Sequence, residues 1–221
     1  FSIQQRDFYG FIYFHSEGSC LMTSHKKNPI IVGITGASGA MMARATVDEL
    51  LRRDIPTVAL CSNAGRLVWQ EELKENYNET LVEWQEHPSF VHYPINELRA
   101  PVASGTYPTA GMVIVPASMN SIASLAGGLS GNLLLRTADV CLKERRPLVL
   151  VPRETPLHSI HLENMLTLAR MGAIVVPPEP AFYLEPQDIT DIVNFVVARV
   201  LVALGVDQSM PNEMQYEGPE A

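Results

Sequence analysis

The chain has 221 residues, of which 47% are hydrophobic and 18% are charged, and its formal net charge is -8. A chain of this length can bury one substantial core without splitting into two domains. The acidic balance argues against nucleic acid as a partner, because a phosphate backbone attracts a basic surface. No apolar run reaches the roughly 18 residues that span a bilayer, so we expect no membrane insertion.

Residues 1–29 are expected to form an N-terminal extension. This segment lacks the basic start, long apolar run and cleavage site of a signal peptide. Met22 and the polar residues after it resemble a natural start, so the residues before Met22 would be upstream or non-native. The three cysteines, Cys20, Cys61 and Cys141, are widely spaced and show no metal-type spacing, which indicates reduced thiols in a cytoplasmic protein.

From residue 30 the pattern alternates between β-branched apolar runs and longer amphipathic runs. It predicts strands at 30–35, 56–61, 112–115, 148–151 and 173–176 and helices at 40–53, 63–73, 118–126, 133–145, 158–171 and 189–204. Between them, the polar and proline-broken residues 74–107 predict a surface excursion with short helices. Such alternation requires parallel strands with right-handed crossovers. We therefore predict a single-domain, Rossmann-like (flavodoxin-like), doubly wound parallel sheet over residues 30–206, and a tail, 207–221, as a candidate lid over the site.

Small polar residues follow three of the predicted strands, at the edge where ligands bind in such sheets. After the first strand, residues 36–39 read Gly-Ala-Ser-Gly, so that the amides at the following helix start and the Ser38 hydroxyl can bind phosphate; an ordinary tight turn explains the glycines almost equally well. Ser62 ends the second strand and Ser118 to Ser121 end the third, although helix capping explains either one. Their convergence favours a flavin.

Residues 136–146 are rich in basic side chains, and a further basic residue, Arg153, stands beside Glu154. We expect these groups to gather at one sheet edge and to bind a phosphorylated ligand. Arg136 and Lys143 are seven residues apart and can share a helix face, while a simple ion pair between Lys143 and Asp139 is the plainer alternative.

The sequence resembles the flavin prenyltransferase family of the UbiX/Pad type over about residues 30–205. The resemblance lies in residues 33–39, 103–105, 116–118, 136–140, 142–156, 161–165 and 181–183, and the block 142–156, which ends Val-Pro-Arg-Glu-Thr-Pro, is highly specific. It implies an enzyme that joins the dimethylallyl group of dimethylallyl phosphate to N5 and C6 of reduced FMN, without a metal. It also implies a homo-oligomer, often a dodecamer, with sites at subunit junctions, which supplies prenylated FMN to a UbiD-type decarboxylase.

The resemblance also implies roles for individual residues. Glu154 would transfer protons and Glu72 would be a second acid near the flavin, although Glu71 leaves that register open by one residue. The donor phosphate would be bound by Ser104, Gly105, Arg136, Lys143, Tyr183 and Arg199. FMN would be bound by Gly36, Ala37, Ser38, Ser62, Ser118, Met119, Asn120, Ser121 and Arg153.

The sequence departs from the family pattern in several places, including Leu73-Lys74 after Glu72, where Thr-Asp is common. Met42-Ala43 stands where Tyr-Gly is common, and Tyr216 stands near where many members carry a tryptophan over the site. His158 and His161, with Glu163 nearby, have a spacing that could bind a metal, but two histidines without a clear third ligand more often form a packed or solvated face.

Two other functions remain open. A flavin-dependent cysteine decarboxylase shares a motif like residues 116–120 but would need His87 or His92 as its catalytic histidine. A non-catalytic FMN carrier would share the flavin cleft and would need neither Glu154 nor a second set of cations.

Overall fold

A computed structural model describes residues 28–216 and residue 218, so the predicted extension at 1–29 lies almost wholly outside the described residues. Its centre is a parallel sheet in the order β3-β2-β1-β4-β5-β6. The strands are β1 (Ile30–Ile34), β2 (Thr57–Cys61), β3 (Phe90–His92), β4 (Gly111–Ala117), β5 (Leu148–Pro152) and β6 (Ile174–Val175). This order is that of a doubly wound Rossmann sheet, and it reverses between β1 and β4. The predicted fold class is confirmed.

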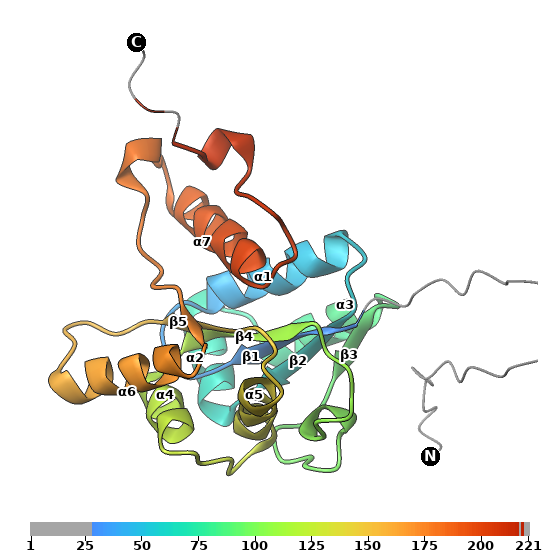
Figure 1. Ribbon diagram of the computed structural model, residues 1–221. Helices are drawn as coiled ribbons and strands as arrows, with labels where there is room; N and C mark the ends of the chain where they lie inside the picture. The colour runs from blue at the N-terminus through green and yellow to red at the C-terminus, as the bar shows by residue number, and fades with distance from the viewer. Residues whose placement is uncertain (1–27, 217, 219–221) are drawn as a thin grey trace, which may run out of the picture.

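Helices cover both faces of the sheet (Figure 1). One face packs against α1 (Ala40–Arg52), α2 (Asn63–Leu73), α3 (Tyr77–Gln85) and α7 (Ile189–Ala203). The other face packs against α4 (Met119–Ala126), α5 (Leu133–Lys143) and α6 (Ser159–Arg170). Within the described residues, the short 3-10 helices η1 (Pro101–Ala103) and η2 (Phe182–Leu184) lie in connections, and η3 (Asn212–Met214) lies in the segment after α7.

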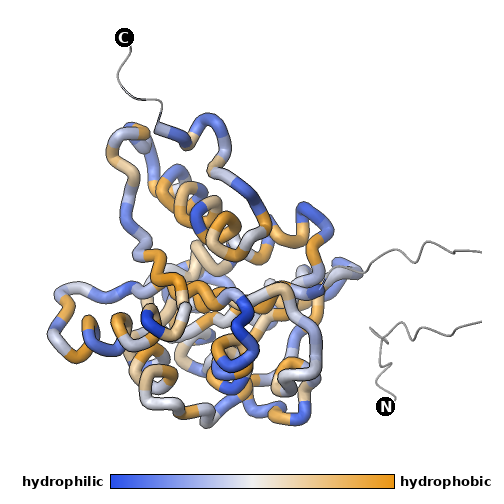
Figure 2. The backbone as a smooth tube through the Cα atoms, in the orientation of Figure 1, coloured by the Kyte–Doolittle hydropathy of each residue, from blue (hydrophilic) through white to orange (hydrophobic). Residues whose placement is uncertain are grey.

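Alternation along the strands builds the two cores. Ile30, Val32 and Ile34 of β1 face the α1 and α7 side, whereas Ile31 faces the α5 side. All five β1 residues are buried, as expected for a strand that is covered on both faces. The apolar segments accordingly run through the middle of the molecule (Figure 2).

The sequence-based prediction missed one strand and misplaced some ends. β3 has only three residues, inside the segment 74–107 that was expected to hold short helices alone, and it is recognisable only because it pairs with Thr57–Ala59 of β2. At the other edge, β6 has two residues instead of four. Helix α5 ends at Lys143 rather than Arg145, since Arg145 has a φ of 54°, which a right-handed helix does not allow.

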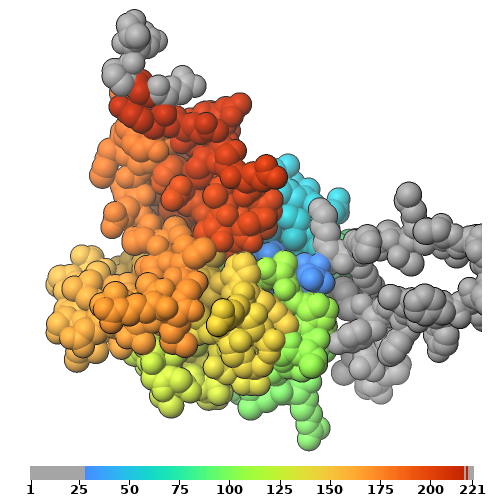
Figure 3. Space-filling view, viewed as in Figure 1, coloured from blue at the N-terminus to red at the C-terminus, as the bar shows by residue number. Residues whose placement is uncertain are grey.

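The chain after α7 folds back over the α1 and α7 side, where it adds to the lobe in the upper part of Figure 3. Arg53 at the end of α1 donates to both carboxylate oxygens of Asp207, at 2.8 and 2.9 Å, and so anchors the base of this segment. Among the described residues, no helix combines the length and apolar character needed to cross a bilayer.

Candidate functional site

Thr35 joins the ends of β1 and β4, the point where the strand order reverses. Its hydroxyl donates to the Pro116 carbonyl at 2.6 Å and accepts the Ser118 amide at 2.8 Å. Thr35 is buried, so both bonds are protected from water. They hold the first residue of the α4 turn beside the glycine loop that follows β1. Sequence reasoning did not single out Thr35, although its place directly before Gly36 was a usable signal.

The loop from Gly36 to Gly39 requires glycine at both ends. A Cβ at Gly36 would overlap the Ala64 side chain at the start of α2. Gly39 has a φ of 121°, a backbone conformation that L-residues rarely adopt. Met42, at the position where the family commonly has tyrosine, is buried beneath Gly39 and belongs to the core. The loop is therefore shaped by close packing as well as by any ligand.

Glu72 occupies the amino end of α1. Its carboxylate accepts the amides of Gly39 at 2.9 Å and Ala40 at 2.8 Å. Burial by itself would raise the pKa of Glu72, but hydrogen bonds from the Ser38 hydroxyl and the two amides, together with the charge of Arg153, bring the net pKa below its ordinary value. Glu72 thus occupies the Gly39 and Ala40 amides in this structure, and phosphate binding by the amides at this helix start stays a prediction. The backbone before them, at Gly36, Ala37 and Ser38, stands at the same edge.

Ser62 and Ser118 cap the helices that follow their strands. The Ser62 hydroxyl accepts the Gly65 amide at 3.0 Å, and the Ser118 hydroxyl accepts the Ser121 amide at 3.3 Å. The capping alternative thus holds for both serines, which nevertheless lie at the carboxyl ends of β2 and β4. Met119 and Asn120 form the first turn of α4 beside them. Capping uses only the hydroxyl oxygen, so the Ser62 hydroxyl keeps a proton to donate, while the Ser118 hydroxyl shares a further hydrogen bond with the Ser121 hydroxyl at 3.0 Å.

Arg153 and Glu154 follow β5 at this same edge. The Arg153 amide donates to the Ala117 carbonyl at 3.4 Å, and its guanidinium Nε is buried without a hydrogen-bond partner. Its charge acts on Glu72, which places the two side chains near each other. Glu154 is exposed and accepts the Thr155 amide at 3.0 Å. A buried guanidinium nitrogen without a protein partner fits an anionic or carbonyl-bearing ligand here.

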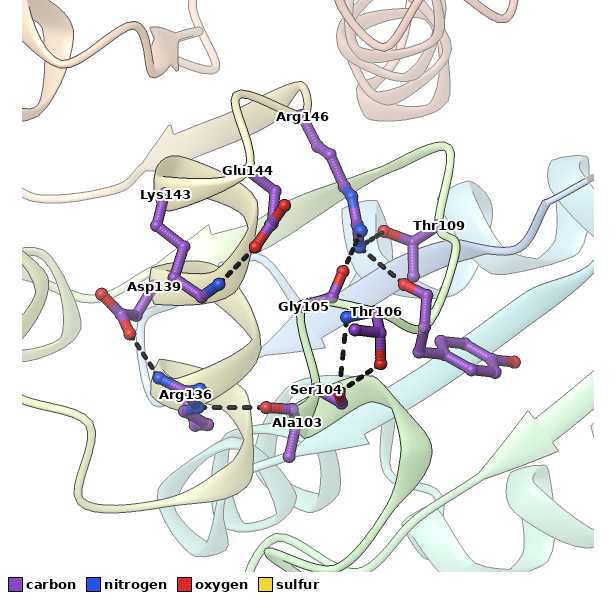
Figure 4. Close-up of polar contacts among 11 residues, drawn as sticks. Ala103, Ser104, Gly105, Thr106, Thr109, Arg136, Asp139, Lys143, Glu144 and Arg146 are labelled. Carbon is purple, nitrogen blue, oxygen red and sulfur yellow. Dashed lines mark hydrogen bonds and ion pairs between the residues drawn. The ribbon is translucent and has the colours of Figure 1, made fainter.

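A second group of polar side chains gathers between α5 and the residues after η1 (Figure 4). Arg136 donates to the Ala103 carbonyl at 3.1 Å and pairs with Asp139 at 2.8 Å. Lys143 pairs with Glu144, and a Cβ at Gly105 would meet the ends of both side chains. Ser104 exchanges a hydrogen bond with Thr106 at 2.9 Å. The plainer alternative for Lys143 is wrong, because Asp139 pairs with Arg136 instead.

Arg146 fastens the segment after Gly105 to the end of α5. Its guanidinium donates to the Gly105 carbonyl at 2.5 Å, the Tyr107 carbonyl at 2.7 Å and the Thr109 hydroxyl at 3.2 Å. Sequence reasoning placed Arg146 among the cations but gave it no separate role. We call Arg136, Asp139, Lys143, Glu144 and Arg146, with the backbone at 103–105, the α5 cluster.

Lys143 and Arg146 of the α5 cluster do not share a sheet edge with Arg153, contrary to expectation. Lys143 and Arg146 precede β5, while Arg153 and Glu154 follow it. The five residues of β5 separate them by about 16 Å at roughly 3.3 Å per residue. Residues that are contiguous in sequence therefore lie at opposite edges.

Tyr183 and Arg199 lie apart from the α5 cluster. Arg199 is an exposed residue of α7, and Tyr183 belongs to η2 in the same lobe, whereas α5 packs on the opposite face of the sheet. The Tyr183 and Tyr216 rings meet edge to face with centroids 5.6 Å apart. The tail as a lid stays a prediction, which the KM for the prenyl donor of a Tyr216→Ala variant would test.

The histidines give no sign of a metal centre. The rings of His158 and His161 stack with centroids 3.4 Å apart, and His158 caps α6 by accepting the His161 amide at 3.4 Å. Within residues 28–216 and 218, no three His, Cys, Asp or Glu side chains are grouped to hold a metal ion. Burial, aided by the charge of Arg66, lowers the pKa of His92 to about 4. His87 lies 3.6 Å from Asp54 at the far end of α1.

Comparison with known proteins gives consistent matches. The family model described as Flavoprotein matches residues 19–201. Flavin prenyltransferase UbiX of Alkalihalophilus pseudofirmus is 44% identical over 194 residues, which cover 86% of this chain and 97% of that protein. UbiX of Methanocaldococcus jannaschii is 43% identical over 183 residues, which cover 82% of this chain and 95% of that protein.

Two solved structures are also similar. The crystal structure of AnUbiX (PadA1) with FMN and dimethylallyl pyrophosphate has a TM-score of 0.80 and 36% identity, and covers 88% of this chain and 100% of that one. A dodecameric FMN-dependent UbiX-like decarboxylase from Escherichia coli O157:H7 has a TM-score of 0.78 and 39% identity, and covers 86% of this chain and 100% of that one.

Proposed function

The chain belongs to the flavin prenyltransferase family, and we propose that it transfers the dimethylallyl group of dimethylallyl phosphate to N5 and C6 of reduced FMN. Membership makes it an enzyme of prenyl transfer with FMN as its flavin. One observation carries the finer proposal: the chain has two separate sets of anion-binding groups, one around Arg153 and one along α5. A flavin phosphate and a prenyl phosphate would each need such a set.

The flavin site is proposed at the carboxyl edge of β1, β2, β4 and β5. The unpartnered Arg153 Nε, the hydroxyls of Ser62 and Ser118, and the backbone amides of residues 36–38 can donate to an acceptor-rich ligand. Bound there as reduced FMN, the flavin would supply the nucleophile for the allylic carbon. Glu72 of α2 stays ionised against the amino end of α1 and keeps the loop in place. We propose that this is its contribution beside the flavin.

The donor site is proposed on the α5 cluster. Expulsion of phosphate from an allylic carbon leaves negative charge on the leaving oxygen, and fixed donors stabilise that charge best when they are already in place. Arg136 and Arg146 are held by carbonyl groups, so their guanidinium groups need little reorganisation. Lys143 is a mobile point charge beside them. Ser104 and Gly105 complete this wall of the site.

A second copy of the chain would bring the two sets together. Within one chain, the α5 cluster lies on one face of the sheet. Tyr183 and Arg199 belong to the lobe on the other face. Helix α6 and its flanks expose six large apolar side chains, a surface suited to burial against another copy: Leu157, Ile160, Leu162, Leu166, Met171 and Ile174. The Escherichia coli neighbour is dodecameric. We propose a homo-oligomer, as in that neighbour, with each site completed at a junction.

Glu154 is proposed to move protons at the reacting centre. It is exposed, follows Arg153 directly and has a local hydrogen bond only to the Thr155 amide. A carboxylate in that place can take the proton released when the new ring regains aromaticity, or protonate the departing phosphate. The product would serve a partner decarboxylase of the UbiD type. The free, buried thiols of Cys61 and Cys141 suit the cytoplasmic location that we propose.

The alternatives have less support. The cypemycin decarboxylase CypD matches with a TM-score of 0.56 but 13% identity, which shows the fold alone. Of the two histidines that a cysteine decarboxylase could use, His92 packs against Tyr77 with ring centroids 6.4 Å apart, and His87 lies 3.6 Å from Asp54, beyond the carboxyl end of α1. A protein that only carries FMN would not need the second set of anion-binding groups in the α5 cluster.

The test is the mass of the flavin after incubation of the protein with reduced FMN and dimethylallyl phosphate. The proposal expects a flavin heavier by one dimethylallyl group, with phosphate released in equal amount. Recovery of unmodified FMN with both the monophosphate and the diphosphate donor would contradict the proposed prenyl transfer. Release of carbon dioxide from a cysteinyl substrate would favour the decarboxylase.

A further inference from the structure

The ion pair between Lys143 and Glu144 stands directly over Gly105. A Cβ at Gly105 would collide with the ends of both side chains. The ion pair therefore lies directly against the Gly105 backbone. The side chains are 45% and 37% exposed. An exposed pair of neighbouring residues contributes little to stability, so Lys143 is held in position without being locked there.

The other cations of the α5 cluster are held more firmly. Arg136 is bound by the Asp139 carboxylate and the Ala103 carbonyl, and Arg146 is bound by the carbonyls of Gly105 and Tyr107. Lys143 is therefore the cation that can turn most easily from its protein partner to a ligand. Hydrogen bonding and the charge of Lys143 lower the pKa of Glu144, so Glu144 is a full negative charge at neutral pH.

The charges of the α5 cluster nearly balance. Within the cluster, three cations, Arg136, Lys143 and Arg146, stand against two carboxylates, Asp139 and Glu144, which leaves one positive charge in surplus, and the adjacent exposed Arg145 adds to it. A ligand that carries one phosphoryl group suits this small surplus. A second phosphoryl group would add negative charge next to the Glu144 carboxylate, which repels it.

We propose that Glu144 is a positioning and selectivity residue: it keeps Lys143 over Gly105 and makes the donor site favour one phosphoryl group over two. The inference rests on the proposed function, because it assigns the prenyl phosphate to the α5 cluster. Glu144 acts through its charge and through Lys143, and it takes no part in bond breaking. Its removal frees Lys143 and adds one unit of positive charge to the site.

The experiment compares inorganic phosphate with inorganic pyrophosphate, by titration calorimetry on the full-length oligomer loaded with FMN and without divalent cations. Glu144→Gln should shift the ratio of the two Kd values toward pyrophosphate by about three- to tenfold, the range expected for one partly screened charge. Glu144→Asp keeps the charge and should leave the ratio within about twofold of the wild-type ratio. Glu86→Gln makes the same change of net charge on α3, away from the cluster, and should leave the ratio unchanged.

An unchanged ratio in Glu144→Gln, or an equal shift in Glu86→Gln, would overturn the inference. Turnover with dimethylallyl phosphate and dimethylallyl diphosphate separates this failure from that of the proposed function. If the wild type prenylates FMN and the Kd ratio does not move, Glu144 has no such role. If the ratio of the two Kd values shifts but neither donor yields prenylated FMN, the role of Glu144 in selectivity is supported and the proposed prenyl transfer is contradicted.

Discussion

The carboxylate of Glu72, in the last turn of α2, accepts the backbone amide of Gly39 at 2.9 Å. With the Ala40 amide at 2.8 Å, this bond fills the anion-binding end of α1 with a group from the protein itself. The glycine loop after β1 is thereby tied to α2 before any ligand arrives. A flavin would meet a loop that is already in place.

Replacement of Glu72 by glutamine should destabilise the fold by about 0.5–1 kcal/mol at neutral pH, because α1 loses an anionic cap. The folded-state pKa of Glu72 lies below the ordinary value of 4.5. Its stabilising effect is therefore complete above that value and is lost as the pH falls through the folded-state pKa. Urea unfolding of both proteins at pH 7 and near pH 4 should show the difference shrinking in acid.

Glu71→Gln is the matched control for this change, since Glu71 is the adjacent exposed carboxylate and does not bind the α1 amides. It should leave the free energy of unfolding nearly unchanged at both pH values. Equal effects of the two substitutions would show that Glu72 is no cap, and would reopen the choice between the two positions.

Thr35→Val should cost about 1–3 kcal/mol of stability, because the buried Pro116 carbonyl and Ser118 amide lose their partner. Thr137→Val provides the comparison. The Thr137 hydroxyl is equally buried but has no hydrogen-bond partner, so its replacement by a methyl group should be neutral or stabilising. The midpoints of urea unfolding measure the stability of both variants. Similar losses of stability in the two variants would contradict the proposed link between β1 and β4.

Lys143→Ala should raise the KM for dimethylallyl phosphate by about tenfold or more, as expected when a charged hydrogen bond to phosphate is lost. The Kd for FMN should stay the same, because Lys143 belongs to the donor site, whereas FMN is proposed to bind the separate set of groups around Arg153. Steady-state kinetics and a flavin fluorescence titration measure the two quantities. A parallel loss of both affinities would argue against two separate anion sites.

Glu154→Gln should bind FMN as the wild type does and should lower kcat by about 100-fold or more, the typical contribution of a positioned acid or base. The substitution preserves the shape of the side chain and can still accept the Thr155 amide. Flavin titration verifies binding, and the yield of prenylated flavin measures turnover. Full product formation by the variant would show that Glu154 does not transfer protons in the reaction.

The order of strands and helices could be predicted from sequence because each buried strand is a β-branched run and each helix has an apolar face. β3 could not, since three residues beside Pro94 carry too little pattern and its pairing with β2 is a long-range contact. The same limit applies to β6, whose two residues at the sheet edge are partly exposed.

The site was harder to predict because sequence neighbours need not be neighbours in space. The basic block from Arg136 to Glu154 is nearly continuous in sequence, yet β5 runs through it and separates Lys143 and Arg146, which precede the strand, from Arg153 and Glu154, which follow it. The parallel topology could have revealed this, since residues before and after a strand always lie at different edges. The bond from Glu72 to Gly39 depends on the packing of α2 beside α1, which no spacing rule contains.

The central claim is that one copy supplies Glu154 and the flavin edge while another supplies the α5 cluster. A mixture of Lys143→Ala and Glu154→Gln chains, refolded together and assayed at limiting dimethylallyl phosphate, tests it directly. At limiting donor, Lys143→Ala alone should keep about a tenth of the wild-type rate or less and Glu154→Gln about a hundredth or less. Random assembly should restore about a quarter of the wild-type rate, because about one junction in four joins two intact residues. Activity no higher than the sum of the separate variants would contradict the claim, since Lys143 and Glu154 would then have to act within the same chain.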